Sequence, residues 1–306
     1  MDRTLQDRAT GARDYHVHSG FSDGVLAVDA LVARLAAHGV QEWALTDHDT
    51  VDGLPAATQA SAAHGLRLLP GVELSCTFNA HTVHVVGLAI DPSSAPLQRV
   101  LQRLDAQRQS RAEQIAQRLS AAGVADAWAH TRTVAGHHRL TRTHFARMLV
   151  AQGYARDMKA AFHRYLADGK SAAVRSAWVP LEEAVAVIHA AGGIAVLAHP
   201  LRYARTHARR RRTVAAFAEG GGDAIELSTA AQAPSGAQDQ LARYAAERGL
   251  FGSLGSDFHD PAQHWIRLGE LPPLPSQVRP IWQHPRWPHS AEAAASAPST
   301  QVAHAW

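Results

Sequence analysis

The sequence predicts an α/β protein with a largely parallel sheet, interrupted by an all-helical insertion. Short β-rich runs alternate with amphipathic helical runs in the first third of the chain, and the alternation resumes after about residue 180. This order is typical of α/β folds. Between about residues 92 and 172 no run has the pattern of a strand, and the apolar spacing is helical instead.

Before the insertion, the predicted order is strand, helix, strand, helix, strand, strand. Turn residues (HSGFSDG) follow the first strand, and glycines end both helical runs. The predicted strands are 13–17, 41–46, 66–75 and 81–90, and the predicted helices are 28–38 and 52–64. When one short helix or loop connects each strand to the next, consecutive strands usually lie side by side in one sheet.

The insertion begins with one long amphipathic run, 97–122, and continues as two shorter helical runs around 143–153 and 156–169. Beyond it, the predicted helices are 181–191, 206–219 and 236–248, and the predicted strands are 193–198, 223–228 and 250–259. We therefore expect an α/β unit made of residues 1–92 and 175–285 and a helical insertion at 93–174. Residues 286–306 are rich in Ala, Ser and Pro, and we expect a disordered tail there.

Composition narrows the class of protein. With 306 residues, 46% of them hydrophobic, the chain can bury a large core. It has no run of 18 apolar residues and no apolar segment at its N-terminus, which argues against a membrane span and a signal peptide. Its one cysteine, Cys76, is expected in the core. We expect a cytoplasmic protein without an obligate protein partner, and its net charge of +3 is compatible with an anionic substrate.

The placement of histidine and acidic residues predicts a metal site. The chain has 20 histidines, and histidine is the commonest metal ligand. Loops at the carboxyl ends of parallel strands meet on one face, so residues distant in sequence come together there. The residues at or near predicted strand ends are His16, His18, Asp23, Asp47, His48, Asp49, Glu73, His84, His199, Asp257 and His259.

The chemistry of this set favours a cluster of hard or borderline divalent cations. Imidazole and carboxylate without thiolate suit Mn²⁺, Zn²⁺ or Fe²⁺. His16 and His18 are two residues apart, so both side chains point to one side of an extended segment, and Asp257 and His259 repeat the spacing. A carboxylate such as Glu73 can bridge two cations. The pattern predicts a phosphoesterase in which a hydroxide that bridges two metals attacks phosphorus.

Six motifs resemble those of a known family. HVHSGFSDG, LTDHDT, GVELS, HVVGL, LAHP and GSDFH occur in this order over residues 14–90 and 180–260. They resemble the successive motifs of the PHP (polymerase and histidinol phosphatase) superfamily. Within it, the sequence is most similar to the bacterial branch of 3′,5′-nucleoside bisphosphate phosphatases and 5′→3′ exoribonucleases. The resemblance implies a distorted seven-stranded β/α barrel with two to three cations, most often Mn²⁺, with Zn²⁺, Fe²⁺ or Mg²⁺ as alternatives.

The resemblance also implies a ligand set. Carried over by position, the nine ligands are His16, His18, Asp23, His48, Glu73, His84, His199, Asp257 and His259. The first metal would have His16, His18, Glu73 and Asp257, the second Glu73, His84 and His199, and the third Asp23, His48 and His259. Asp47 and Asp49 would then orient ligands and anchor their loop. His81 lies three residues before His84 and would face the opposite side of a strand.

We expect substrate selection to come from the insertion. Basic side chains there could hold a second phosphate: Arg142, His144, Arg147, Lys170 and Arg175. A solvated helix face is an equally good explanation in a chain so rich in arginine. Arg202, just after His199, is better placed to touch the scissile phosphate.

The leading hypothesis is an enzyme that removes the 3′-phosphate of 3′,5′-nucleoside bisphosphates and also acts 5′→3′ on short RNA. Its substrate would be a nucleotide or a short oligoribonucleotide. One alternative is a phosphatase for histidinol phosphate or another small monoester, which needs no second phosphate anchor. The other is a non-catalytic metal-binding module.

Overall fold

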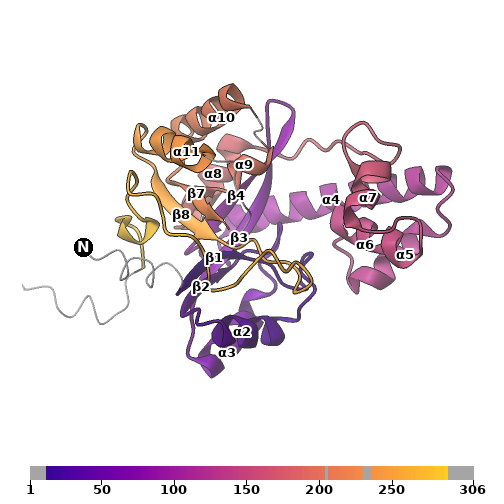
Figure 1. Ribbon diagram of the computed structural model, residues 1–306, viewed down its shortest axis with the longest axis horizontal. Helices are drawn as coiled ribbons and strands as arrows, with labels where there is room; N and C mark the ends of the chain where they lie inside the picture. Colours follow the sequence, from indigo (N-terminus) through magenta and orange to yellow (C-terminus); the bar gives the residue numbers. More distant parts are fainter. Residues whose placement is uncertain (1–11, 204–205, 230–235, 289–306) are drawn as a thin grey trace, which may run out of the picture.

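Seven strands form the wall of a nearly closed barrel in the computed structural model, which describes residues 12–203, 206–229 and 236–288 (Figure 1). Along the wall their order is β1–β2–β3–β4–β6–β7–β8. Their bounds are β1 Arg13–Val17, β2 Glu42–Leu45, β3 Arg67–Phe78, β4 His81–Leu88, β6 Ile194–Leu197, β7 Ala224–Thr229 and β8 Phe251–Gly255; the short β5, Val179–Pro180, pairs with β3. A bridge between Val17 and Phe258 brings β8 beside β1. The predicted α/β barrel is confirmed.

One strand runs against the others. β4 is antiparallel to both β3 and β6, while the remaining neighbours in the wall are parallel. The cause is local, because only Asn79 and Ala80 connect β3 to β4, and both have positive φ, of 47° and 59°. Two such residues make the tight turn of a hairpin. The hairpin also extends β3 to Phe78, so Glu73 lies within the strand and not at its end.

Helices cover the outside of the barrel at the positions that the sequence predicts. Five of them are α2 Val28–Ala37, α3 Leu54–His64, α8 Leu181–Ala190, α10 His207–Glu219 and α11 Ala237–Ala246, with a short α9 at Pro200–Tyr203. Each of the five turns a row of apolar residues inward, as Leu31, Val32 and Leu35 do in α2. No helix in the described part of the chain is long and apolar enough to cross a membrane.

The long helix α4 (Ala95–Ala121) joins the barrel to a group of smaller helices (Figure 1). These are α5 Ala127–Ala135, α6 Arg142–Ala151, α7 Met158–Ala161 and the π-helical turn η1 Phe162–Leu166. The first turns of α4 bury Leu97 and Leu104 in the barrel core, whereas Ile115 and Leu119 belong to a second core shared with the small helices. The barrel core therefore continues past residue 93, where the sequence places the insertion boundary.

The chain returns to the barrel after β8. Trp287 is buried and packs edge-on against Tyr15, with ring centroids 5.1 Å apart. Arg286 donates to the Asp223 carboxylate at 2.6 Å. Both residues fall in the segment expected to be a disordered tail, and their contacts place them in the fold; residues 289–306 lie outside the described part.

Trp287→Ala should lower the free energy of unfolding by about 3–5 kcal/mol, because it leaves a cavity where a buried indole packs on the barrel. Trp265→Ala is the matched control, since that indole is 67% exposed and its loss should change stability by less than about 0.5 kcal/mol. Denaturant unfolding of both variants measures the difference. Equal losses would contradict the packing of Trp287.

Candidate metal centre and substrate cleft

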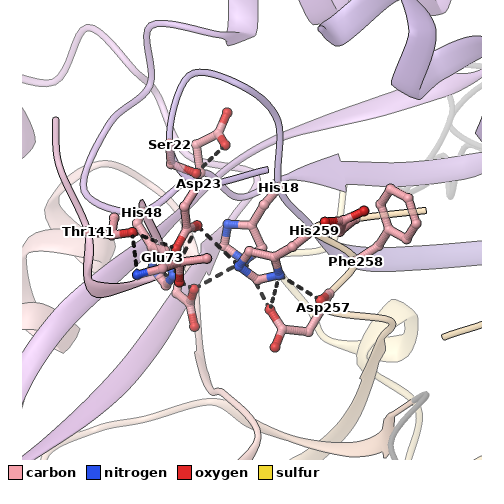
Figure 2. Close-up of polar contacts among 12 residues, drawn as sticks. His18, Ser22, Asp23, His48, Glu73, Thr141, Asp257, Phe258 and His259 are labelled. Carbon is pink, nitrogen blue, oxygen red and sulfur yellow. Dashed lines mark hydrogen bonds and ion pairs between the residues drawn. The ribbon is translucent and has the colours of Figure 1, made fainter. Parts of the chain in front are cut away.

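The structure brings the nine predicted ligands into one buried cluster at the mouth of the barrel. His16 is in β1 and His18 follows it, His48 follows β2, and Asp257 and His259 follow β8. Figure 2 shows His18, His48, Asp257 and His259 around Glu73. Glu73 and His84 come from the hairpin, and His199 follows β6. His81 does not join them, because it lines a separate pocket with Arg209 and Arg212 on the other side of β4.

Glu73 lies at the centre of the cluster. Its carboxylate is fully buried, and five imidazoles surround it. Oε1 lies 2.9 Å from both His84 Nδ1 and His199 Nε2. Oε2 lies 2.8 Å from His48 Nδ1 and 3.3 Å from the Nε2 atoms of His16 and His18. One carboxylate with both oxygens shared in this way can serve more than one cation.

Three groups of side chains have their ligand atoms within 4.8 Å of one another: His16, His18, Glu73 and Asp257; His18, Asp23, His48 and His259; and His48, Glu73 and His84. The first matches the grouping that the resemblance implies. The second is the implied third set with His18 added. The last group corresponds to the implied second set, but it contains His48 in place of His199. His199 also contacts Glu73.

Two of the histidines are held with a defined ring nitrogen toward the cluster. His259 donates Nδ1–H to the Asp257 carbonyl at 2.8 Å, which leaves Nε2 to face Asp23 Oδ1 at 3.2 Å. His16 places Nδ1 2.9 Å from Glu226 Oε1, so its Nε2 faces Glu73 and Asp257. A hydrogen bond at one ring nitrogen fixes which nitrogen is available to a metal.

Glu226, on β7, is a buried acid that the sequence analysis missed. Its Oε1 holds His16, and its Oε2 accepts the backbone N–H of His199 at 2.7 Å. It lies in DAIELS, within a predicted strand, where a single acidic residue among apolar ones was the available signal. Glu226 thus positions two residues of the cluster.

Asp47 and Asp49 hold the loops and do not face the centre. Asp47 accepts hydrogen bonds from the backbone N–H of Ser19 at 2.8 Å and from the hydroxyls of Ser19 and Ser22 at 2.6 Å. Asp49 accepts from the backbone N–H of Ser75 at 2.7 Å and from Arg108 Nε at 2.6 Å. Both acids therefore anchor the segments that carry Asp23 and His48.

Three residues at the site have a strained backbone conformation. Asp49, His199 and Asp257 have positive φ, of 52°, 27° and 52°. Such conformations are costly for residues other than glycine and gather at functional sites. Gly255, two residues before Asp257, has no room for a side chain, because a Cβ there would lie 2.2 Å from His16 Cβ.

The electrostatics of the cluster favour a cation. Burial lowers the pKa of His18, but the adjacent carboxylates of Asp257 and Glu73 outweigh burial and raise that pKa to about 10. Burial raises the pKa of Asp257, but the charges of Arg202 and His16 hold it well below its usual range. The carboxylates therefore stay ionised and create a negative field among the imidazoles, which also attracts divalent ions.

The residues present fit a metal cluster. Asp23 Oδ1, Glu73 Oε2 and Asp257 Oδ1 are buried and have no hydrogen-bond partner among the described residues. Buried polar atoms are normally hydrogen-bonded, so unpaired oxygens that converge on imidazole nitrogens indicate a ligand. The donor set of nitrogen and carboxylate oxygen, without sulfur, is the one that Mn²⁺, Zn²⁺ and Fe²⁺ take.

A cleft of about 880 Å³ opens from the cluster toward the helical insertion. Three predicted substrate residues line it, Arg142, Arg147 and Arg202. Arg202 also forms an ion pair with Asp257. Arg108 and Arg111 line the cleft as well, and the sequence analysis missed both because α4 is rich in arginine throughout. Lys170 and Arg175 are not among the lining residues.

His144 has a structural role instead of the expected contact with phosphate. It is buried, and its Nδ1 accepts the backbone N–H of Thr141 at 3.0 Å in a capping box at the start of α6. Burial lowers the pKa of its imidazole to about 4, so the ring is neutral and a poor anion anchor. Thr141 in turn donates its hydroxyl to Asp23 Oδ2 at 3.1 Å, which ties α6 to the cluster (Figure 2).

Comparisons with known proteins agree with this geometry. The model of the PHP domain family matches residues 14–193. The chain belongs to the PHP domain family. PHP relatives with similar sequences include a 5′-3′ exoribonuclease of Haemophilus influenzae, 42% identical over 88% of this chain and 97% of its own. A 3′,5′-nucleoside bisphosphate phosphatase of Chromobacterium violaceum is 40% identical over 88% of this chain and 95% of its own.

Two solved structures share the fold of this PHP protein. One, of an amidohydrolase from Chromobacterium violaceum with bound sulfate and no metal, has a TM-score of 0.84 at 39% identity and covers 89% of this chain and 94% of its own. The other is assigned as a metal-dependent phosphoesterase from Bifidobacterium adolescentis. It has a TM-score of 0.77 at 26% identity and covers 87% of this chain and 93% of its own.

Glu226→Gln should weaken metal binding by about 10–100-fold, as is typical when a partner of a ligand is lost. An amide cannot accept from both His16 and the His199 backbone, because one of its two ends donates. Chelator competition followed by elemental analysis measures the affinity, and Glu219→Gln, at an exposed position, is the control. Affinity equal to that of the wild type would show that His16 is oriented without Glu226.

Proposed function

We propose that this PHP protein is a metal-dependent phosphoesterase that removes the 3′-phosphate of 3′,5′-nucleoside bisphosphates and releases nucleotides 5′→3′ from short RNA. Two relatives named for these substrates are about 40% identical to it over most of both chains. The nine clustered residues are the proposed ligands of two to three cations, with Mn²⁺ the preferred ion. The observation that carries the substrate assignment is a second cationic site in the same cleft.

That second site is the arginine pocket, which we define as Arg108, Arg111 and Arg142. Arg111 and Arg142 form no ion pair with a carboxylate in the described part of the chain. Burial, and then the charges of Arg142 and Arg108, lower the pKa of Arg111 to about 9. Like charges held together in a partly buried cleft are stabilised by an anion, and arginine matches the geometry of phosphate.

Aromatic rings line the arginine pocket. The guanidinium groups of Arg108 and Arg111 lie 5.3 Å and 5.4 Å from the ring of Trp178, and Arg142 lies 5.9 Å from that of Phe162. Such stacking holds the arginines in place. Arg108 is also paired with Asp49, whereas stacking leaves the charges of Arg111 and Arg142 available to an anion. The pocket is therefore suited to the non-scissile 5′-phosphate.

At the metal centre, the scissile 3′-phosphate would lie between the cluster and Arg202. Divalent cations, when bound, activate a water for attack on phosphorus and offset the charge on its oxygens. Arg202 lines the cleft beside Asp257 and is partly exposed, so it can hold a phosphoryl oxygen. The buried imidazoles and carboxylates keep the site rigid around the reacting atoms.

Hydrolysis of the same bond, between phosphorus and O3′ of the first nucleotide, accounts for both the phosphatase and the exoribonuclease activity. In a nucleoside bisphosphate and in 5′-phosphorylated RNA, water attacks the phosphorus attached to O3′ of the first nucleotide, and O3′ leaves with a proton. The products are a nucleoside 5′-monophosphate and either inorganic phosphate or RNA with a new 5′-phosphate. The shortened RNA presents the same two phosphates again, so removal continues 5′→3′.

The alternatives make different use of the cleft. A phosphatase for histidinol phosphate or another small monoester has one anion to hold, which leaves the arginine pocket without a ligand. A non-catalytic metal-binding module needs no cleft beside its metals. Turnover of adenosine 3′,5′-bisphosphate, AMP and histidinol phosphate with Mn²⁺ separates these possibilities, and we expect the bisphosphate to be the best substrate.

Glu73→Gln should remove most of the bound metal and abolish activity, because Glu73 contacts five imidazoles and bridges the proposed ion sites. Elemental analysis of the wild type should find two to three divalent ions per chain. Glu247→Gln, at an exposed position, should leave both measurements unchanged. Wild-type protein that neither contains a transition metal nor responds to Mn²⁺ would contradict the metal assignment.

Arg142→Ala should raise KM for the bisphosphate at least about tenfold, which corresponds to roughly 1.4 kcal/mol, as expected for the loss of one charge-assisted hydrogen bond. A plain aryl phosphate lacks the second phosphate, so its turnover should fall much less. Arg175→Ala serves as the control, because that arginine is exposed and does not line the cleft. Equal losses on both substrates would assign Arg142 to the fold or the metal site.

A further inference from the structure

Trp265 has the highest exposed fraction, 67%, of the exposed large apolar side chains that the structure describes. Single exposed apolar residues are common on proteins, so exposure alone indicates nothing. This indole, however, lines the substrate cleft together with Gln263 and Ile266. It is an exposed aromatic surface beside a phosphate-binding cleft.

The segment that carries Trp265 is fixed at both ends. It begins at His259 of the cluster, whose carbonyl accepts the backbone N–H of Val25 at 2.8 Å. Within it, Ala262 N–H bonds to Asp260 Oδ1 at 2.8 Å and Ile266 N–H bonds to the Gln263 carbonyl at 2.9 Å. Ile266 and Leu268 are buried directly after the tryptophan. The indole is therefore presented on an anchored turn.

Trp265 and the arginine pocket belong to different sides of the barrel. The turn with Trp265 follows β8, whereas Arg108 donates to Ser75 Oγ on β3 at 2.9 Å. β1 and β2, whose ends carry His18 and His48, lie between β8 and β3 in the wall. The arginine pocket thus lies on the β3 side of the cluster. An open aromatic ring lies on the β8 side, where Arg202 pairs with Asp257 and Arg147 approaches Asp260.

We propose that Trp265 is a stacking platform for the nucleobase that lies immediately 3′ of the scissile phosphate in an RNA substrate. This inference rests on the proposed function. With the 5′-phosphate in the arginine pocket and the next phosphate at the cluster, the following nucleotide leaves toward the β8 side. Every base has a flat π face, so an indole there holds the chain without selecting its sequence. A nucleoside bisphosphate has no base at this position, so Trp265 would favour the polynucleotide.

The test uses two 5′-phosphorylated dinucleotides that differ only in the second residue, which is adenosine in one and an abasic ribose in the other. For the wild type, loss of the base should raise KM about tenfold, within the range for one base on an aromatic ring. For Trp265→Ala, KM should be the same for both substrates. Trp265→Phe should keep most of the wild-type ratio, and so should Val134→Ala, a change at an exposed apolar residue outside the cleft.

Each other outcome overturns the inference in a recognisable way. A wild-type ratio in Trp265→Ala places the base elsewhere. An equal rise in KM for both dinucleotides assigns Trp265 to the sugar-phosphate chain or to the shape of the loop. A wild-type ratio near one shows no contact with the base. Turnover of the bisphosphate without either dinucleotide overturns this inference and the proposed RNA activity but leaves the bisphosphate phosphatase standing, whereas turnover of none of the three overturns the whole proposed function.

Discussion

The burial of the Glu73 carboxylate among five imidazoles is the interaction on which the site depends. An isolated buried carboxylate is expensive, because burial removes the water that would solvate its charge. Here the imidazoles of His16, His18, His48, His84 and His199 replace that water. These histidines come from four segments of the chain, because His16 and His18 both belong to β1 or follow it directly, so they surround the carboxylate only when the barrel is assembled. The site is therefore complete only in the closed barrel.

The helical insertion is tied to the same centre by polar contacts. Thr141 donates to Asp23, Arg108 to Asp49, and His137 lies 2.8 Å from the Ser22 carbonyl. A displacement of the insertion would therefore pull on the loops that carry Asp23 and His48. The same contacts fix the arginine pocket relative to the cluster, and in the proposed function that spacing would decide which pair of phosphates can bind at once. In the proposed function, these contacts would hold the phosphate-binding arginines and the metal ligands in fixed positions relative to each other.

One side chain that was expected to recognise substrate, His144, caps a helix instead, and its position on that helix is the reason. His144 and Arg142 are two residues apart on α6, so they point in different directions from the helix. Arg142 reaches the cleft, while His144 turns inward and caps the helix on Thr141. Arg108 and Arg111 are three apart on α4 and share a face, which turns both toward Trp178. Composition concealed them, because arginine is frequent along the whole helix.

The sequence by itself determined the α/β class, the helical insertion and the residue types of the histidine and carboxylate cluster. Strand and helix periods are local properties, and chemically distinct residues such as His16, His48 and Asp257 mark the strand ends. Only the tertiary structure decided which groups support them. The antiparallel β4, the role of Glu226, the inward turn of His144 and the arginine pocket depend on contacts between segments far apart in the chain. Local periodicity carries no information about such contacts, because they arise from how the elements pack.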